Sequence, residues 1–367
     1  MSLAPHILQF QTSLLNRVTA SAPLLTRIAQ YYILQPSKRI RPCLIFLIAQ
    51  ATNGLGAEWS AKLRASGLDQ TQCPHETVLP SQVSLAEVIE MIHVASLLHD
   101  DVLDDAPLRR GAPSAPAAFG NKRAILGGDF LLGRAMALCA SLGTPEVMSV
   151  VADALCALVD GELIQAEAEE PERVSTPSTD GSSESEYPTY VNGSDQSKED
   201  VAKLWQDYLK KTYMKTASLF SQALQAAVML GGATSTDPWR DVAATYGSEL
   251  GMAFQIIDDL LDFKGDQKDL GKAANAADMK LGLVTAPAFF ALEEDENMLP
   301  LILRHFEHPG DVVKALGIVY STQALERTRD LAQAYATRAY ECLEPLPPSP
   351  AKAALQTMTE VVMARQR

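Results

Sequence analysis

Cysteine, aromatic residues and long apolar runs are scarce in this sequence, and each scarcity excludes a class of protein. The five cysteines are scattered and odd in number, which argues against a disulfide framework or a zinc site and indicates a reducing compartment. No apolar run approaches the roughly 18 residues that span a bilayer. The formal net charge is -14, so a general affinity for nucleic acid is excluded because the phosphates would be repelled.

Acidic residues are missing from the first part of an otherwise acidic chain. None precedes Glu58, whereas Arg17, Arg27 and several Ser and Thr residues fall in that segment. This composition suits a mitochondrial targeting segment, so we expect a mitochondrial location, with the cytoplasm as the alternative. The other interpretation of Ile7–Tyr32 is that it is simply the first helix of the fold.

Apolar residues recur at helical spacing through most of the chain, and Leu85–Leu98 is a clear example. Aromatics are only 6% of the residues and no stretch alternates as a strand would, so we predict an all-α bundle of about ten or more helices. Residues 1–367 are expected to form one domain with two interruptions. Residues 54–82 resemble a long connection, and the Ser- and Glu-rich residues 167–200 a disordered loop.

Two clusters of aspartates follow strongly apolar helical runs. Asp100 and Asp104 are four residues apart and would project from one helix face, as would Asp258 and Asp262. One such cluster would normally be a solvated surface, but two at the edge of apolar segments indicate metal ligands. Magnesium is typically held by one or two carboxylates together with substrate phosphates. The full clusters are Asp100, Asp101, Asp104 and Asp105, and Asp258, Asp259 and Asp262.

Basic residues alternate with these acids along the chain. Arginine offers a planar fork that matches a diphosphate, and lysine offers a point charge. Any one of these bases alone could be an ordinary surface residue, but the combination with the aspartates predicts a site for metal and diphosphate. The bases are Lys38, Arg39, Arg41, Arg109, Arg110, Lys215 and Lys272.

Short segments over roughly residues 30–300 carry a family resemblance. They are Lys38–Pro42, Ile92–Asp101, Arg109–Gly111, Phe119–Lys122, Gly127–Leu132, Gly161–Gln165, Lys215–Leu219, Phe254–Phe263 and Gly271–Lys272. In these segments and their order the chain resembles the trans-polyprenyl diphosphate synthases. It looks most like the fungal mitochondrial long-chain enzymes that make the ubiquinone side chain.

The resemblance implies a fold, a reaction and a set of site residues. The fold would be an isoprenoid-synthase-type helical bundle around a central apolar cavity. The reaction would be the repeated, Mg2+-dependent condensation of isopentenyl diphosphate with an allylic diphosphate. Asp100, Asp104 and Asp258 would bind Mg2+, supported by Asp101, Asp259 and Asp262, and Lys215 would complete the catalytic set. Arg109, Lys215, Thr216, Gln255 and Lys272 would contact the allylic substrate, and Lys38, Arg41, His93 and Arg110 would bind isopentenyl diphosphate.

Two small residues near the first cluster bear on product length. Ala95 and Ser96 lie about one turn before Asp100, where a bulky aromatic would block a growing chain. We therefore predict a product of more than about twenty carbons, since each helical turn advances about one isoprene unit. The chain departs from the family pattern at Ser37 and in the run after Lys272, which bears on how the site closes.

Several alternatives stay open at this point. One is a shorter-chain synthase of the geranylgeranyl type, and another is a non-catalytic partner subunit of a heteromeric synthase. A terpene cyclase would use the same metal chemistry, but the bases of a second diphosphate site argue against it. The resemblance implies a homodimer or a heteromer with a related subunit. An apolar product suggests peripheral association with a membrane.

Overall fold

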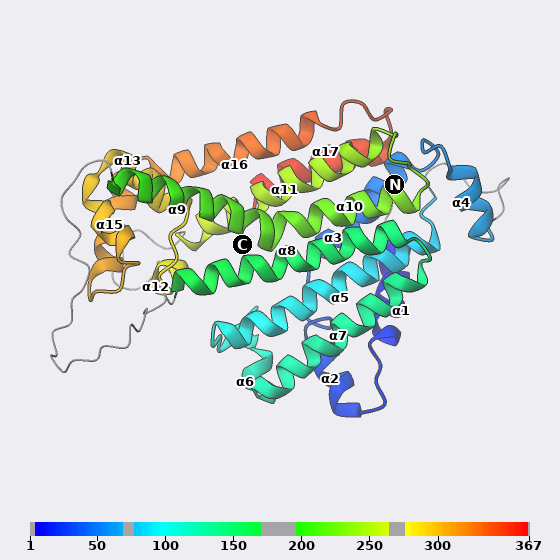
Figure 1. The fold of residues 1–367 in the computed structure, drawn as a ribbon, viewed down its shortest axis with the longest axis horizontal. Helices are drawn as coiled ribbons and strands as arrows, with labels where there is room; N and C mark the ends of the chain where they lie inside the picture. Colours follow the sequence, from blue (N-terminus) through cyan, green and yellow to red (C-terminus); the bar gives the residue numbers. More distant parts are fainter. Residues whose placement is uncertain (1–3, 69–76, 170–195, 264–275, 366–367) are drawn as a thin grey trace, which may run out of the picture. The chain divides into compact units, whose positions relative to one another are not determined.

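The computed structural model describes residues 4–68, 77–169, 196–263 and 276–365, and these residues are almost entirely helical (Figure 1). The all-α prediction is therefore confirmed. The α-helices are α1 (Ala4–Arg17), α2 (Pro23–Tyr31), α3 (Ile40–Thr52), α4 (Trp59–Ala65), α5 (Pro80–Leu103), α6 (Ala115–Phe119), α7 (Asn121–Ser141), α8 (Pro145–Glu169), α9 (Gln196–Thr212), α10 (Ser218–Leu230), α11 (Trp239–Asp262), α12 (Ala277–Lys280), α13 (Ala286–Glu294), α14 (Leu299–Leu303), α15 (Asp311–Ser321), α16 (Ala324–Glu341) and α17 (Pro350–Met363). The short elements are β1 (Leu108–Arg109), β2 (Ala112–Pro113), the π-helical turn η1 (Tyr213–Ala217) and the 3-10 turn η2 (Glu296–Met298).

These elements divide into two compact units. The first comprises Met1–Cys156, Ala217–Gly251 and Ala336–Val361. The second comprises Ala157–Thr216, Met252–Tyr335 and Val362–Arg367. Each aspartate cluster belongs to a different unit, the first cluster to the first unit and the second to the second.

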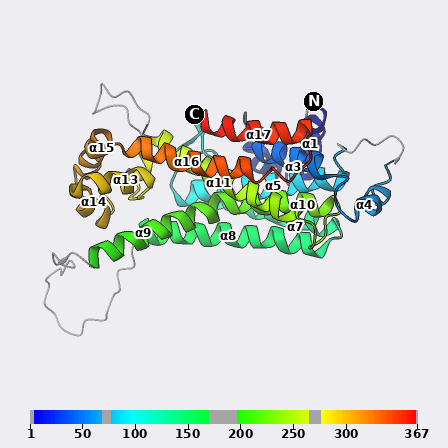
Figure 2. The ribbon, with the colours of Figure 1, turned by 90° about the horizontal axis from the view of Figure 1, so that it is seen from above.

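Helix α5 is the core helix of the first unit. It packs against α1, α3, α6, α7 and α10, several of which flank it in Figure 2. Buried residues occur all round it, which is the pattern of a helix enclosed by others. At its start the buried Gln82 amide is fully bonded, because it exchanges hydrogen bonds with Asn53 and also binds Leu79 N and Ala227 O, all within 2.9 Å.

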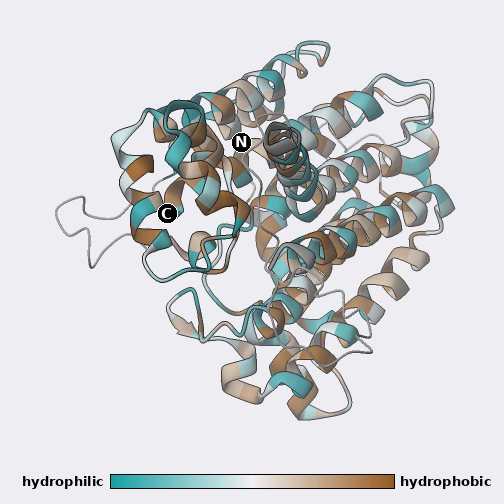
Figure 3. Ribbon diagram, turned by 60° about the vertical axis from the view of Figure 1, so that its left-hand side comes forward, coloured by the Kyte–Doolittle hydropathy of each residue, from teal (hydrophilic) through white to brown (hydrophobic). Residues whose placement is uncertain are grey.

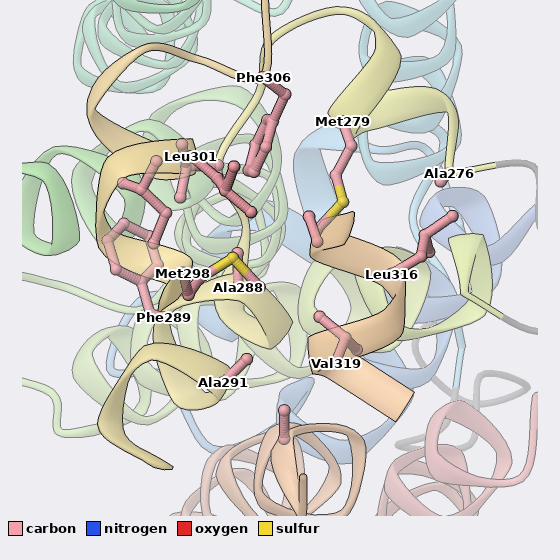
Figure 4. Close-up of a cluster of buried hydrophobic side chains, with 14 of the residues drawn as sticks. Ala276, Met279, Ala288, Phe289, Ala291, Met298, Leu301, Phe306, Leu316 and Val319 are labelled. Atoms are coloured by element: carbon pink, nitrogen blue, oxygen red, sulfur yellow. The ribbon is translucent and has the colours of Figure 1, made fainter. Parts of the chain in front are cut away.

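The second unit has its own apolar core, shown in Figure 4. Side chains from α13, η2, α14 and α15 meet there, among them Phe289, Met298 and Val319. Trp205 of α9 packs edge-on against Phe289, with 5.2 Å between ring centroids, and stacks on Tyr208 at 5.4 Å. This packing fixes the tyrosine whose hydroxyl reaches the second aspartate cluster.

The structure corrects several boundaries predicted from the sequence. Residues 54–82 are not one long connection, because they contain α4 and the start of α5. The predicted loop 167–200 is shortened at both ends by α8 and α9, and its residues 170–195 lie outside the described part of the chain. Ile7–Tyr32 forms two helices rather than one, since α2 starts anew at Pro23.

Two of the described helices, α5 and α7, are long and apolar enough by length and composition to cross a membrane. Neither is an unbroken apolar run, since α5 contains Glu87 and Glu90 and α7 contains Asp129 and Arg134. In α5 72% of the apolar window is buried inside the protein, as expected of a core helix, whereas in α7 only 39% is buried. In Figure 3 hydrophobic and hydrophilic residues are interleaved along the helices.

Candidate active site

The first aspartate cluster lies where α5 ends. Asp100 and Asp101 belong to its last turn, and Asp104 is the residue at the C-cap. The backbone N–H of Asp104 donates to the carbonyl of Asp100 at 2.8 Å, so the two residues stay one turn apart as predicted. Asp105 then turns the chain away with a left-handed φ of 46°, which aspartate tolerates better than most residues.

Asp101 is a buried anchor at the centre of this cluster. Its side chain is 0% exposed, and Oδ2 accepts a hydrogen bond from the hydroxyl of Tyr32 while Oδ1 accepts one from Arg109 Nε at 2.7 Å. The Tyr32 hydroxyl in turn accepts from the backbone N–H of Ala115 at 2.6 Å. Burial and the Asp101 carboxylate raise the pKa of Tyr32, which keeps its hydroxyl protonated and able to donate.

A tight hairpin presents Arg109 to the cluster. Strands β1 and β2 pair antiparallel, and the residues between them, Arg110 and Gly111, both have positive φ values, 53° and 77°. Two positive φ values favour a hairpin turn that follows the twist of its strands. Arg109 Nη2 lies 4.0 Å from Asp100 Oδ2, so the arginine that anchors on Asp101 also neutralises its neighbour.

His93 lies two turns before Asp100 on α5, among positive charges. Burial lowers its pKa well below the ordinary value, and Arg41, Arg110, Arg109 and Arg39 add to the shift in that order. The imidazole is therefore neutral at neutral pH. The structure thus brings His93 within electrostatic reach of Arg41 and Arg110. These three are among the four residues predicted to bind isopentenyl diphosphate.

The two basic residues before Arg41 differ in their surroundings. Arg39 is 8% exposed, is ion-paired with Glu90 and donates to the carbonyl of Ile33, so it stabilises the fold. Lys38 beside it is exposed. Arg41 is half-buried, and its guanidinium lies over the ring of Phe220 at 4.8 Å from the centroid.

The second cluster repeats the buried anchor of the first. Asp259, in the last turn of α11, is 5% exposed. Its Oδ2 accepts from the Tyr208 hydroxyl at 2.7 Å, and its Oδ1 accepts from Gln255 Nε2 at 3.0 Å. The neighbouring carboxylates face different partners. Asp262 accepts from the backbone N–H groups of Ala277 and Asp278 at 3.0 and 3.1 Å, and so caps α12.

Lys215 and Thr216 lie on the π-helical turn η1 that precedes α10. Such turns are rare and are frequent at functional sites. Thr216 Oγ1 donates to Gln255 Oε1 at 2.8 Å, which links the turn to the second aspartate cluster through Gln255. The predicted site residues Lys215, Thr216 and Gln255 are thus connected within the second unit.

Glu162 and Gln165 of α8 hold Lys215 in place, a role that the sequence did not reveal. Lys215 Nζ lies 2.7 Å from Glu162 Oε2 and 2.7 Å from Gln165 Oε1. Gly161 allows this approach, because a Cβ there would lie 2.7 Å from Lys215 Cγ and 3.0 Å from its backbone N. From the sequence alone, Gly161–Gln165 shows only the family resemblance.

Two further residues at the second cluster were not predicted. Arg365, after α17, places Nη2 at 2.8 Å from Asp258 Oδ1. Asp278 is half-buried near Asp259 and Asp262, and desolvation first, then these two charges, raise its pKa from 3.8 to about 7. The sequence carries no signal for Arg365 or Asp278, since neither lies at a regular spacing from the second cluster.

Of the remaining predicted residues, the structure describes Ala95 and Ser96 but not Lys272. Ala95 is fully buried in α5, and Ser96 is half-buried with its Oγ donating to the carbonyl of His93 at 2.8 Å. Lys272 lies outside the described residues. Within the described part of the chain, no three His, Cys, Asp or Glu side chains are grouped closely enough to hold a metal ion.

The accessible carboxylates nevertheless suit a hard divalent cation. The side chains of Asp100 and Asp258 are 22% and 35% exposed, in contrast to the buried Asp101 and Asp259. At Asp258 a guanidinium already occupies the place of a counter-cation. Partly exposed oxygen donors suit a hard divalent cation that keeps other coordination positions for water or substrate oxygens.

The sequence profile of the polyprenyl synthetase family matches residues 22–319. The chain therefore belongs to this family, whose members are prenyltransferases. A probable mitochondrial hexaprenyl pyrophosphate synthase of Neurospora crassa is 38% identical, covering 98% of this chain and 80% of that protein. Decaprenyl-diphosphate synthase subunit 1 of Schizosaccharomyces pombe is 35% identical, covering 98% of this chain and 89% of that protein.

Solved structures agree with the family assignment. A decaprenyl diphosphate synthase from Rhodobacter capsulatus superposes with a TM-score of 0.78 at 28% identity, covering 100% of this chain and 97% of that one. A polyprenyl synthase from Caulobacter crescentus, whose crystals contain calcium and isoprenyl diphosphate, superposes with a TM-score of 0.73 at 25% identity, covering 100% of this chain and 96% of that one.

Proposed function

We propose that this chain condenses isopentenyl diphosphate repeatedly with an allylic diphosphate and makes a long-chain all-trans polyprenyl diphosphate, the precursor of the ubiquinone side chain. The observation that carries the proposal is the repeated design of the two clusters. In each one the second aspartate is buried against a tyrosine hydroxyl, Tyr32 or Tyr208, and the first aspartate stays partly exposed. The relatives named above are long-chain synthases, and the mitochondrial one supports a mitochondrial location.

Each cluster has a defined division of labour in this proposal. Asp100, Asp104 and Asp258 hold Mg2+, which would neutralise the diphosphate and make it a leaving group. Asp101, Asp259 and Asp262 position these ligands through the contacts described above. Arg109, Lys215, Thr216, Gln255 and Lys272 bind the allylic diphosphate, and Lys38, Arg41, His93 and Arg110 bind isopentenyl diphosphate.

The covalent step needs no further nucleophile from the protein. The allylic C–O bond breaks, pyrophosphate leaves, and the double bond of isopentenyl diphosphate attacks the allylic carbon to form the new C–C bond. A proton is then lost to the departing pyrophosphate, which restores a double bond. The protein excludes water from the cation, a task suited to the apolar residues of α5 near Ala95.

We further propose that the protein acts as a dimer formed through α7, either with itself or with a related subunit. Leu126 on this helix is 61% exposed, although most of α7 is apolar. The exposed and half-buried residues on one face of α7 are self-complementary in an antiparallel pairing about a two-fold axis between Leu131 and Leu132. In that pairing Leu126 lies opposite Ala137 of the other helix and Phe130 lies opposite Gly133, so a large side chain faces a small one. Asp129 lies opposite Arg134, so an acid faces a base.

One assay tests the proposed reaction. The purified chain is incubated with labelled isopentenyl diphosphate, an allylic primer and Mg2+, and the product length is measured. We expect a product of more than about twenty carbons, because each helical turn advances about one isoprene unit. The product is released as a diphosphate for use at a membrane, with which the protein would associate peripherally. A product that stops at twenty carbons would favour the geranylgeranyl-type alternative.

Two variants control this assay. Asp100→Asn and Asp258→Asn should abolish condensation while leaving the helical content and Tm close to those of the natural protein. If the natural chain is inactive alone but active with a homologous subunit, it belongs to a heteromer. Inactivity in both settings would refute the enzyme proposal.

A further inference from the structure

The guanidinium of Arg365 is held against the second aspartate cluster by two different contacts. Nη2 lies 2.8 Å from Asp258 Oδ1, and the guanidinium carbon lies 3.9 Å from the centroid of the Phe254 ring. Nη1 also reaches the carbonyl of Phe254 at 3.5 Å. Phe254 and Asp258 are four residues apart on α11, so they form one face on which a planar cation fits.

The surroundings show that this is more than a loose surface pair. The Arg365 side chain is 13% exposed and that of Asp258 is 35% exposed, so the pair is partly withdrawn from solvent. Charges in such a position are screened less by salt than exposed ones. The Nε of Arg365 is buried and makes no hydrogen bond to any described residue, so this cation is held chiefly by Asp258 and the ring.

A metal ion and this guanidinium compete for the same carboxylate. A magnesium ion that takes an oxygen of Asp258 as a ligand brings two positive charges to within about 2 Å of that oxygen. The metal and the guanidinium repel each other across this carboxylate even if each takes a different oxygen, so the metal either moves Arg365 away or binds more weakly because of it.

We propose that Arg365 is the internal counter-ion of Asp258 and that magnesium displaces it. Metal binding at Asp258 and release of residues 362–365, called the C-terminal segment below, are then one linked equilibrium. Linkage is reciprocal, so the factor by which Arg365 weakens metal binding equals the factor by which the metal loosens the segment. This inference rests on the proposed metal role of Asp258.

The first test is metal affinity in the absence of diphosphate. Mn2+ binding to the full chain is followed by electron paramagnetic resonance, and the part lost in Asp258→Asn is assigned to the second cluster. Arg365→Gln should bind that metal about fivefold more tightly than the natural protein, which corresponds to about 1 kcal/mol of lost competition. Arg338→Gln is the matched control, because Arg338 Nε pairs with Glu249 at 2.7 Å.

The second test follows the C-terminal segment itself by hydrogen exchange of the peptide that ends α17. In the natural protein Mg2+ should speed exchange there by the same factor of about five. Asp258→Asn and Arg365→Gln should both show no response to the metal.

The outcomes separate this inference from the proposal beneath it. If Asp258→Asn binds the metal as well as the natural protein does, the metal assignment fails and the inference fails with it. If Asp258→Asn loses binding but Arg365→Gln does not gain it, only the inference about Arg365 is overturned. Slower exchange on adding metal would likewise overturn it.

Discussion

Asp101 and Asp259 are buried carboxylates, each bonded to a tyrosine from a distant part of the chain and to a second side-chain donor. A buried carboxylate is stable only if its oxygens are satisfied. The tyrosines Tyr32 and Tyr208 meet this need without adding a charge. They leave the adjacent, partly exposed carboxylates to interact with cations.

Tyr208→Phe tests the cost of removing one donor. The change leaves a buried oxygen of Asp259 without the hydroxyl that donates to it at 2.7 Å. We expect the free energy of unfolding to fall by about 1–3 kcal/mol, measured by urea denaturation. Tyr340→Phe is the control, because Tyr340 is 42% exposed and should change the stability little. Equal stabilities for the two variants would contradict the anchor role.

Asp278→Asn tests the raised pKa at the second cluster. In the folded protein this carboxyl keeps its proton up to a pKa of about 7, against 3.8 ordinarily. Between these values the unfolded chain binds fewer protons, so this group makes the protein less stable as the pH rises. The Tm of the variant minus that of the natural protein should therefore increase from pH 4 to pH 8, by about 2–4 °C per kcal/mol. A difference independent of pH would refute the assignment.

Among the elements, the π-helical turn η1 depends on its contact with α8. Gly161→Ala places a Cβ 2.7 Å from Lys215 Cγ and 3.0 Å from its backbone, so Lys215 must shift. A misplacement of about 1 Å can cost about a hundredfold in rate, so we expect kcat/KM for the allylic substrate to fall about tenfold or more. Gly317→Ala on α15 is the control, since its Cβ would meet nothing within 4 Å.

Helix α5 carries the prediction on product length. Ala95 is fully buried one turn before the first cluster, so the larger side chain of Ala95→Phe must occupy space now open or held by neighbours. We expect shorter products with little loss of the first condensation, measured by chromatography of the labelled chains. Overpacking typically costs about 1–3 kcal/mol of stability, so Tm is measured alongside. An unchanged length distribution in a folded variant would contradict the role of Ala95 in product length.

At the scale of the whole molecule, the face of α7 that carries Leu126 is the proposed dimer interface. Leu126→Glu places a charge in the proposed interface and should shift the protein toward monomers in sedimentation at about micromolar concentration. Val313→Glu is the control, because Val313 is 60% exposed on α15. Asp129→Arg should also weaken the dimer, and adding Arg134→Asp should restore it, since the pairing opposes these two residues. An unchanged mass in Leu126→Glu would overturn the interface.

The candidate site was predictable where it depends on spacing within one helix. Asp100 and Asp104 are held one turn apart by a backbone hydrogen bond, as the four-residue spacing predicted. Arg109 could be expected near the cluster because only three residues separate it from Asp105. The contacts of Tyr32, Tyr208, Glu162 and Arg365 could not, because each joins residues that only packing brings together. Their positions follow from which helix faces are buried.

The sequence by itself determined the all-α class, the family and the positions of the two aspartate clusters. Helical periodicity and short motifs extend over a few residues, so they can be recognised without knowledge of the tertiary contacts. Only the tertiary structure decided which carboxylate of each cluster is a buried anchor and which stays accessible. It also decided that Lys215 is held by Glu162 and that Asp258 meets Arg365. Burial and charge pairing arise between segments far apart in the chain, so no local pattern encodes them.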